Sequence, residues 1–428
     1  MILSDLLKDV EIKESSGNIG VRVSGVKINS REVKPGDVFV CIAGFQTDGH
    51  SYVEDALSRG AVAIVAQHEI EDTAATTVIV EDTRGAVSKM AAAFYDYPFR
   101  KFRLIGVTGT NGKTTTTYLI KSILESCGEK VGLIGTNQNM IGETVIPAHR
   151  TTPDSIELME LFAKMADEGV DTVVMEVSSH SLALERVAAC EFDIGAYTNI
   201  TQDHLDFHKT MENYIAAKAI LFGMCKIGVL NRDDESYEKM LAACSCETVC
   251  YGVDCADGVS ASEIEYGMSG VEFTLSYKGK KEHISLAIPG KFSVYNALTA
   301  ASCCIAAGVS LEKIAAGLRA AHGVKGRIEV VKTDTDYTVI IDYAHTPDAL
   351  ENVLKTLRDI GPKSHIICLF GCGGDRDKTK RPEMAAVAEK YADRIFVTSD
   401  NSRTENTEDI LEDIRKGFSR EGLAKALF

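Results

Sequence analysis

The sequence has no long apolar run, no excess of basic residues and no Cys-x-x-Cys pairs. Without an apolar stretch near the length of a bilayer span, no membrane segment is expected, and the acidic Asp5 argues against a signal peptide. The 62 acidic and 46 basic residues give a net charge of −16, which argues against nucleic acid or an anionic membrane as the main partner. These absences favour a cytoplasmic location.

Twelve cysteines are present, but their spacing is not that of zinc knuckles. Most lie in apolar runs such as Ala300–Ala307, where cysteine behaves as a small hydrophobic residue. We therefore expect reduced, buried thiols rather than a structural zinc site.

A glycine-rich loop does stand out, between an apolar strand at residues 104–108 and apolar residues that recur at helical spacing from Leu119 to Cys127. Its glycines allow backbone N–H groups to surround phosphate oxygens, and the helix N-terminus adds partial positive charge. Lys113 supplies a charge near the terminal phosphate, and Thr114 is placed to hold Mg²⁺. Val107 replaces the first glycine of the common Walker pattern. The sequence therefore predicts nucleotide binding by a variant phosphate loop.

The length of 428 residues favours two or three domains, and the element pattern predicts the α/β class. Residues 1–100 show short strands with one or two helices, and residues 101–327 show a parallel α/β sheet followed by antiparallel hairpins at 259–288. Residues 328–428 begin a third α/β pattern, with strands at 338–343, 365–370 and 394–399. The chain stops in a helix-to-strand passage, so the last sheet is expected to be unfinished.

Polar residues at strand ends are the other candidates for chemistry. Glu176 ends an apolar strand of the central domain, where an acidic residue reaches the Mg²⁺ of a bound nucleotide. His204, between Asp203 and Asp206, either binds a second Mg²⁺, positions a phosphate or belongs to a hydrogen-bonded loop. Lys218 lies on a predicted helix, and its spacing is that of an ordinary surface lysine.

The third domain repeats this pattern at three successive strand ends, in residues 342–348, 371–377 and 400–403. Asp, His and Arg side chains there predict a polar rim. Arg376 and Arg403 offer planar guanidinium groups that suit a carboxylate ligand.

Together these residues resemble the Mur ligase family over nearly the whole chain. The motifs that carry the resemblance are Gly109–Thr115, Glu176–His180, Asn199–Asp206, the helix of Lys218, Asn296, Gly326-Arg327, Asp342–Asp348 and Gly371–Asp377. The resemblance implies a three-domain architecture with a central P-loop domain and a Rossmann-like C-terminal domain. It also implies a monomeric, ATP- and Mg²⁺-dependent ligase of peptidoglycan precursor synthesis. The expected reaction adds meso-diaminopimelate to UDP-N-acetylmuramoyl-L-alanyl-D-glutamate through an acyl phosphate.

The resemblance also assigns site residues. Those implied for ATP are Gly109, Thr110, Asn111, Gly112, Lys113, Thr114, Thr115, Asn296, Arg327 and Asp342. Those implied for the UDP-muramoyl dipeptide are Ile28, Ser30, Phe45, Gln46, Thr47, Thr151, Thr152, Ser178 and Arg186. Those implied for diaminopimelate are Arg376, Asp400, Asn401, Ser402 and Arg403. The implied metal ligands are Thr114, Glu176, His204 and Lys218, the last as a carbamate, and the implied catalytic residues are Lys113, Glu176, His204 and Lys218.

Three departures from the family pattern bear on these assignments. Ser402 replaces a proline, although the neighbouring Arg403 still favours diaminopimelate over lysine, and Leu184 replaces a substrate-binding glutamine found in some members. A Gly-Lys-Gly-His-Glu motif that completes the amino-acid pocket is absent from the sequence, so an incomplete acceptor pocket is expected.

Two alternatives remain open. One is a related ligase, either a lysine-adding Mur enzyme or a folylpolyglutamate synthetase. The other is a nucleotide-dependent switch without ligase activity, although the Asn-Lys-x-Asp base reader of guanine-type switches is absent.

Overall fold

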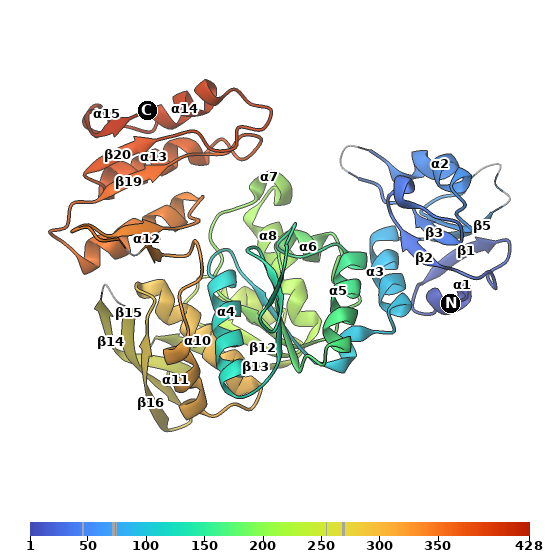
Figure 1. The fold of residues 1–428 in the computed structure, drawn as a ribbon, viewed down its shortest axis with the longest axis horizontal. Coiled ribbons are helices and arrows are strands. Elements are labelled where there is room, and N and C mark those ends of the chain that lie inside the picture. Colours follow the sequence, from blue (N-terminus) through green and yellow to red (C-terminus); the bar gives the residue numbers. More distant parts are fainter. Residues whose placement is uncertain (45–46, 71–72, 74, 254, 268–269, 332) are drawn as a thin grey trace. The chain divides into compact units, whose positions relative to one another are not determined.

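The computed structural model describes all residues except 45–46, 71–72, 74, 254, 268–269 and 332 (Figure 1). Contacts divide the described chain into two compact units. The first comprises Met1–Ile105 and Lys130–Asp193, and the second comprises Gly106–Glu129 and Ile194–Phe428. Among the described residues, no helix combines the length and apolar character needed to cross a bilayer.

The N-terminal part of the first unit contains a five-stranded sheet with the order β1-β5-β4-β3-β2. Its strands are β1 (Ile12–Ser16), β2 (Gly25–Lys27), β3 (Asp37–Val40), β4 (Ala63–Ala66) and β5 (Thr76–Val80), and only β1 pairs antiparallel. Its helices are α1 (Leu3–Leu6), α2 (Val53–Ser58) and α3 (Thr83–Phe94), with short 3₁₀ turns η1 (Ser30–Glu32), η2 (Gly49–Tyr52) and η3 (Pro98–Lys101). Val38 and Val40 on β3 face one apolar cluster and Phe39 faces another, because strand side chains alternate between the two sides.

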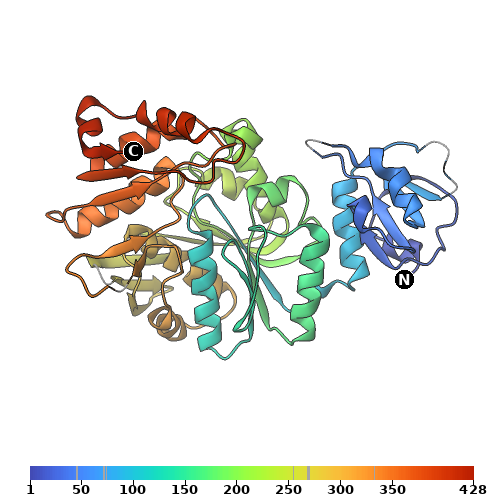
Figure 2. The same cartoon turned by 45° about the horizontal axis from the view of Figure 1, so that its top comes forward.

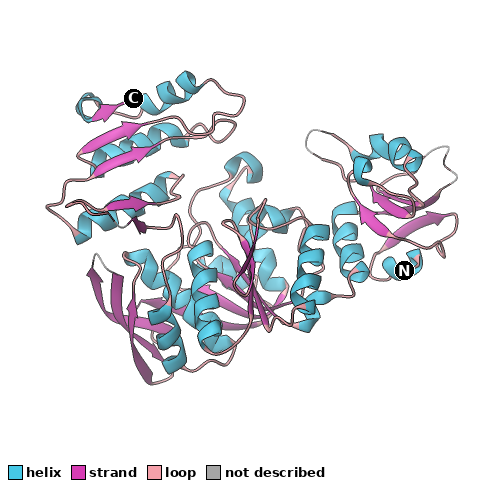
Figure 3. Ribbon diagram, in the orientation of Figure 1, coloured by secondary structure: helices cyan, strands magenta, loops and turns pink. Residues whose placement is uncertain are grey.

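The largest sheet has eleven strands among the described residues, in the order β16-β15-β14-β13-β12-β11-β6-β10-β7-β8-β9. The strands are β6 (Arg103–Thr108), β7 (Val131–Ile134), β8 (Asn139–Ile141), β9 (Thr144–Ile146), β10 (Thr172–Glu176), β11 (Phe192–Tyr197), β12 (Cys225–Asn231), β13 (Glu247–Val253), β14 (Val259–Gly267), β15 (Gly270–Tyr277) and β16 (Lys280–Leu286). The expected hairpins at 259–288 are confirmed, and they extend this sheet because β14 pairs parallel with β13 (Figure 3).

Helices between these strands are α4 (Lys113–Ser126), α5 (Ser155–Asp167), α6 (Ser179–Ala183), α7 (Leu205–His208), α8 (Met211–Ala219) and α9 (Tyr237–Ala242), with the 3₁₀ turn η4 (Ile220–Gly223). Two more helices, α10 (Lys291–Ala306) and α11 (Leu311–Ala320), follow the last strand. In the second unit, α4 packs beside α10 and α11 (Figure 2). Gly317 on α11 allows this approach, because a Cβ there would lie 2.5 Å from the Cα of Ile123.

The C-terminal part of the second unit contains two small sheets. β17 (Glu329–Val331) and β18 (Val339–Ile341) form an antiparallel pair, and β19 (Ile367–Phe370), β20 (Arg394–Val397) and β21 (Ala426–Leu427) form a parallel sheet. The helices are α12 (Pro347–Ile360), α13 (Lys380–Tyr391), α14 (Thr407–Arg415) and α15 (Arg420–Lys425). β18 therefore belongs to a different sheet from β19 and β20, but Nζ of Lys380 donates to the carbonyl of His345 at 2.8 Å, so residues 342–348 lie beside the start of α13.

The three-stranded sheet is covered on one face. Cys368 and Phe370 of β19 pack in a buried cluster with residues of α12, α13 and α14. Ile367 and Leu369 alternate with them and are 62% and 69% exposed. Strands of a parallel sheet are usually buried on both faces and therefore carry apolar residues on both. The outer face of β19 is apolar in this way although it is exposed.

Candidate active site

The glycine-rich loop connects β6 to α4 as expected, and its backbone requires glycine. Gly109 and Gly112 have φ values of +142° and +87°, which side chains rarely adopt. A Cβ on Gly109 would lie 1.9 Å from Oγ1 of Thr198, and one on Gly112 would lie 2.3 Å from Oδ1 of Asn296. Asn296 on α10, a residue expected to bind the nucleotide, therefore lies against the phosphate loop.

The loop is held by the segment after β11. The backbone N–H of Asn111 donates to Oδ1 of Asn199, and Nδ2 of Asn199 donates back to the carbonyl of Asn111, both at 3.1 Å. Oγ1 of Thr198 donates to the same carbonyl at 2.7 Å. Nδ2 of Asn111 donates to the carboxylate of Asp348, at the start of α12, at 2.8 Å. Sequence reasoning gave Thr198 and Asp348 no such role, because their partners are distant in the chain.

Two lysines meet at the loop. Nζ of Lys113 donates to the carbonyls of Gly109 and Thr110, both at 2.9 Å, and Nζ of Lys218 donates to Gly109 at 2.8 Å. Lys218 is 1% exposed, so its interpretation as a surface lysine is wrong. Burial lowers the pKa of Lys218 well below its ordinary value, and the charge of Lys113 lowers it further. The ammonium also lies 4.5 Å from the ring centroid of Tyr214.

His204 lies close to this group. It has a left-handed backbone, with φ of +54°, and precedes α7. Its Nε2 is 3.3 Å from Oδ2 of Asp203, and its ring centroid is 6.3 Å from that of Tyr214. Tyr214 therefore has both His204 and Lys218, two of the four predicted metal ligands, as neighbours.

Arg327 reaches the first turn of α4. Its guanidinium donates to Oγ1 of Thr114 at 3.3 Å and lies 4.7 Å from the ring centroid of Tyr343. Thr114 and the next residue, Thr115, are both buried. Asp342 is used locally, since its two oxygens accept backbone N–H groups at 2.8 and 2.7 Å, and burial raises its pKa. Arg327 is therefore at the loop, whereas Asp342 supports the neighbouring turn.

In the first unit, a polar group surrounds Glu176. The carboxylate of Glu176 accepts hydrogen bonds from the backbone N–H and the hydroxyl of Thr136, at 2.8 and 3.1 Å. Thr136 Oγ1 is 3.0 Å from Oγ1 of Thr151, while Thr152 donates to the carbonyl of Glu176 at 2.9 Å. The backbone N–H of Ser178 donates to Thr152 Oγ1 at 3.1 Å. Sequence reasoning missed Thr136.

Arg186 belongs to the same group. It donates to the carbonyl of Thr152 at 3.2 Å, and its Nε lies 3.1 Å from Oδ1 of Asp154. Burial lowers the pKa of Arg186. The structure therefore brings together Thr151, Thr152, Ser178 and Arg186, the four residues expected for the dipeptide part of the substrate.

The residues expected for the UDP end lie apart from one another in the chain. Ile28 is exposed, Ser30 is buried in η1, and Thr47 is exposed beside a turn in which its carbonyl accepts the N–H of Gly44 at 2.9 Å. Phe45 and Gln46 lie outside the described residues.

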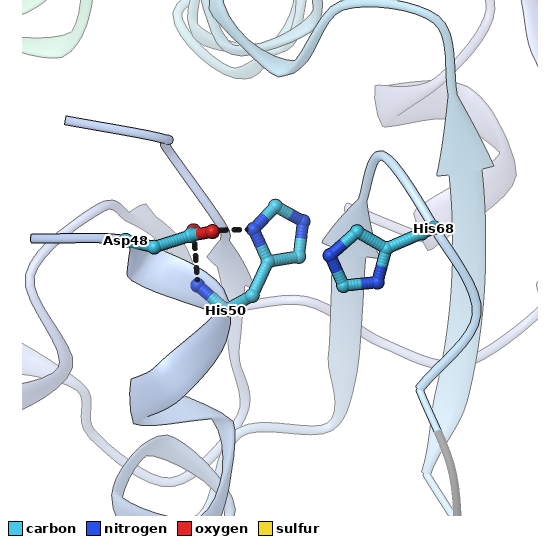
Figure 4. A group of neighbouring side chains, drawn as sticks. All are labelled: Asp48, His50 and His68. Carbon is cyan, nitrogen blue, oxygen red and sulfur yellow. Dashed lines mark hydrogen bonds and ion pairs between the residues drawn. The ribbon is translucent and has the colours of Figure 1, made fainter.

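Asp48, His50 and His68 gather next to that loop, with ligand atoms within 4.8 Å of one another (Figure 4). Nδ1 of His50 is 2.6 Å from Oδ1 of Asp48, and Nε2 accepts the N–H of Gln67 at 3.1 Å. Because Nε2 accepts, Nδ1 carries the proton, so neither ring nitrogen of His50 offers a lone pair to a metal. These contacts therefore join residues 48–50 to the segment after β4.

Two loops of the C-terminal part contain the residues expected for the acceptor. Arg376 and Arg403 are both exposed. Nη1 of Arg403 donates to the carbonyl of Gly374 at 2.7 Å, and its backbone N–H donates to Oδ1 of Asn401 at 3.1 Å. Oδ1 of Asp400 accepts the N–H of Asn401 at 2.7 Å. A Cβ on Gly374 would lie 1.9 Å from the carbonyl oxygen of Ser402, so the loops touch.

The sheet order and the glycine loop at the end of a central strand define the class of P-loop α/β proteins. The Mur ligase family, catalytic domain, matches residues 22–95, the Mur ligase middle domain matches residues 107–304, and the Mur ligase, glutamate ligase domain, matches residues 326–426. The chain belongs to the Mur ligase family.

Relatives and solved structures agree with this assignment. A UDP-N-acetylmuramoyl-L-alanyl-D-glutamate--2,6-diaminopimelate ligase of Caldanaerobacter subterraneus subsp. tengcongensis is 49% identical over 98% of this chain and 87% of its own length. A ligase of the same description from Clostridium acetobutylicum is 46% identical over the same shares. A solved structure of such a ligase matches with a TM-score of 0.75 and 30% identity, covering 98% of this chain and 86% of that one.

Proposed function

We propose that this protein is an ATP-dependent ligase that joins meso-diaminopimelate to UDP-N-acetylmuramoyl-L-alanyl-D-glutamate in peptidoglycan precursor synthesis. The observation that carries the proposal is a set of relatives with 42–49% identity over 92–98% of the chain, whose names all give the 2,6-diaminopimelate ligase activity. The proposed enzyme is a monomer and works in the cytoplasm.

The phosphate loop supports the use of ATP. A carboxylate is a poor acceptor for an amine, so its oxygen first attacks the γ-phosphorus of ATP, which releases ADP and forms an acyl phosphate. The deprotonated amine of diaminopimelate then attacks the acyl carbon, and phosphate leaves with the former C–O bond electrons. Lys113 and the N-terminus of α4 would neutralise phosphate charge during the first step, and positioned charges contribute most of the catalysis in phosphoryl transfer.

Mg²⁺ is part of the proposal. In the second unit, the hydroxyl of Thr114 offers the oxygen ligand that Mg²⁺ prefers. The imidazole of His204, and the carboxylate of Glu176 in the first unit, are assigned as ligands on the family resemblance alone. When bound, the ion offsets charge on the phosphate oxygens and orients them. Asn296 and Arg327 would contact the nucleotide on the side of α10 and the start of α4.

Lys218 is proposed to carry a carbamate. A neutral amine adds to carbon dioxide and loses one proton. Burial and the charge of Lys113 both lower the pKa of Lys218, which favours the neutral amine that this reaction needs. The carbamate is an anion, so it would attract the ammonium group of Lys113, whereas a protonated Lys218 would repel it at the carbonyl of Gly109. It would also supply a carboxylate oxygen to a metal.

The substrate and acceptor sites follow the grouping of polar residues. Thr151, Thr152, Ser178 and Arg186 would hold the dipeptide, with Ile28, Ser30, Phe45, Gln46 and Thr47 for the UDP end. Arg376 and residues 400–403 would hold diaminopimelate, with Arg403 on its distal carboxylate. A planar guanidinium suits a carboxylate in two parallel hydrogen bonds.

Phosphate release tests the proposal. The chain is incubated with ATP, Mg²⁺ and the UDP-muramoyl dipeptide, and meso-diaminopimelate, L-lysine or folate is added, with the Lys113→Ala variant as control. Of the three acceptors, we expect only meso-diaminopimelate to drive phosphate release. Release driven by lysine or folate instead would contradict the acceptor, and ATP hydrolysis without stimulation by the dipeptide would favour the switch alternative.

A further inference from the structure

Arg381, on the first turn of α13, is a fully buried cation that the proposed chemistry does not use. Its side chain is 0% exposed. Nη2 and Nη1 donate to Oε1 and Oε2 of Glu405 at 2.9 and 3.1 Å, and Nη1 also donates to Oδ2 of Asp413 at 2.9 Å. Within the described residues, its buried Nε has no hydrogen-bond partner. The guanidinium is therefore fixed mainly by two parallel bonds to one carboxylate.

Glu405 connects this arginine to the loop of residues 371–377. The backbone N–H of Asp375 donates to Oε1 at 2.6 Å, and Nζ of Lys378 lies 2.9 Å from Oε2. Hydrogen bonds from Arg381 and Lys378 lower the pKa of Glu405 to about 2. The carboxylate is thus ionised at neutral pH and joins the two loops, because it belongs to the segment after β20 and binds the segment after β19.

The same two loops are bonded directly to each other beside this carboxylate. The N–H of Gly374 donates to the carbonyl of Asn401 at 2.9 Å, and Oγ1 of Thr404 donates to Asp375 at 2.7 Å. Arg403 closes the contact through its 2.7 Å bond to the carbonyl of Gly374. Both exposed arginines, Arg376 and Arg403, belong to these two loops, and the ion pair between buried Arg381 and partly exposed Glu405 lies beside the contact between the loops.

We infer that Arg381 is a positioning residue for the amino-acid acceptor, acting through Glu405 to set residues 371–377 against residues 400–405. This inference rests on the proposed function, in which these loops bind diaminopimelate. Buried ion pairs add little net stability compared with apolar residues of the same size, so the value of this one lies in geometry. The planar fork also explains the residue type, since a lysine ammonium cannot make the parallel pair of bonds.

Kinetics of two conservative variants test the inference. Arg381→Lys keeps the charge but loses the fork, and Glu405→Gln keeps the shape but loses the charge. Arg358→Lys is the matched control, because Arg358 bonds Asp393 in the same part of the chain and touches neither loop. We expect KM for meso-diaminopimelate to rise about tenfold or more in the first two variants, by analogy with small misplacements of binding groups. KM for the UDP-muramoyl dipeptide should stay within about twofold, and the control should change neither.

Amide hydrogen exchange gives a readout that needs no activity. In variants that still unfold cooperatively on heating, the amides of Asp375 and Thr404 should exchange faster than in the unmodified chain, since their acceptors are no longer held. Unchanged exchange at both amides would overturn the inference, as would equal increases in KM for all three substrates. If no acceptor stimulates the unmodified chain, the proposed function fails, and exchange alone then decides whether Arg381 sets the loops.

Discussion

Gly109→Ala is the substitution whose effect the structure defines best. The residue has φ of +142°, a region that is almost restricted to glycine and costs other residues about 1–3 kcal/mol. The new Cβ would lie 1.9 Å from Oγ1 of Thr198, so this hydroxyl must turn away from the carbonyl of Asn111 that it now bonds at 2.7 Å. Losing that bond costs about 1 kcal/mol more.

If the loop rearranges, the total of about 2–4 kcal/mol appears as lost affinity for ATP. The reason is that the carbonyl of Gly109 accepts hydrogen bonds from both Lys113 and Lys218 and so holds the two lysines at the loop. That energy corresponds to a weakening of Kd for ATP by about 30- to 1,000-fold. Titration calorimetry with ATP and Mg²⁺ measures the affinity, and thermal unfolding measures any part of the cost that lowers stability instead.

Gly128→Ala is the matched control at the other end of α4. It also has a positive φ, +90°, but a Cβ there meets nothing within 4 Å. We expect a loss of about 1–2 kcal/mol in stability and an unchanged Kd for ATP. If the Gly109→Ala variant bound ATP as tightly as the Gly128→Ala variant and were equally stable, the loop would not require the positive φ of Gly109.

Three further predictions concern charged residues. Lys113→Ala should abolish turnover and leave binding of the UDP-muramoyl dipeptide intact, as measured by phosphate release and by calorimetry; measurable turnover at the normal rate would contradict the role of this lysine. Arg403→Ala should raise KM for meso-diaminopimelate more than KM for ATP, and equal effects on both would argue against its contact with the acceptor. The pKa of Glu405 falls from 4.5 to about 2 on folding, so its stabilising effect is complete above pH 4.5 and is lost as the pH falls toward 2. The difference in free energy of unfolding between the unmodified chain and Glu405→Gln should therefore shrink in that range, and a constant difference would refute the ion pair.

The phosphate loop could be predicted because its determinants are local. An apolar strand, two glycines and a Lys-Thr pair occupy consecutive positions, and each sets the backbone or the charge of its own segment. The same holds for the hairpins at 259–288, whose period-two pattern and turns are adjacent in sequence. The family resemblance rests on several such local motifs in order, which is why it extended over nearly the whole chain.

Lys218 shows where local pattern fails. Its helix, α8, gives no sign that one side lies against the phosphate loop, since the acceptor of its ammonium is Gly109, more than a hundred residues earlier.

The burial of Arg381 is still harder to predict, because its sequence context favours an exposed side chain. A basic residue in the first turn of a helix opposes the helix dipole, and Lys380 beside it favours a solvated position. Burial occurs because Glu405 and Asp413, 24 and 32 residues later, converge on the guanidinium and replace its water. Their convergence requires β20 to lie beside β19, which the spacing of charges does not encode. A buried cation of this kind is therefore found only after the sheet is assembled, although it sets the loops on which the acceptor is expected to bind.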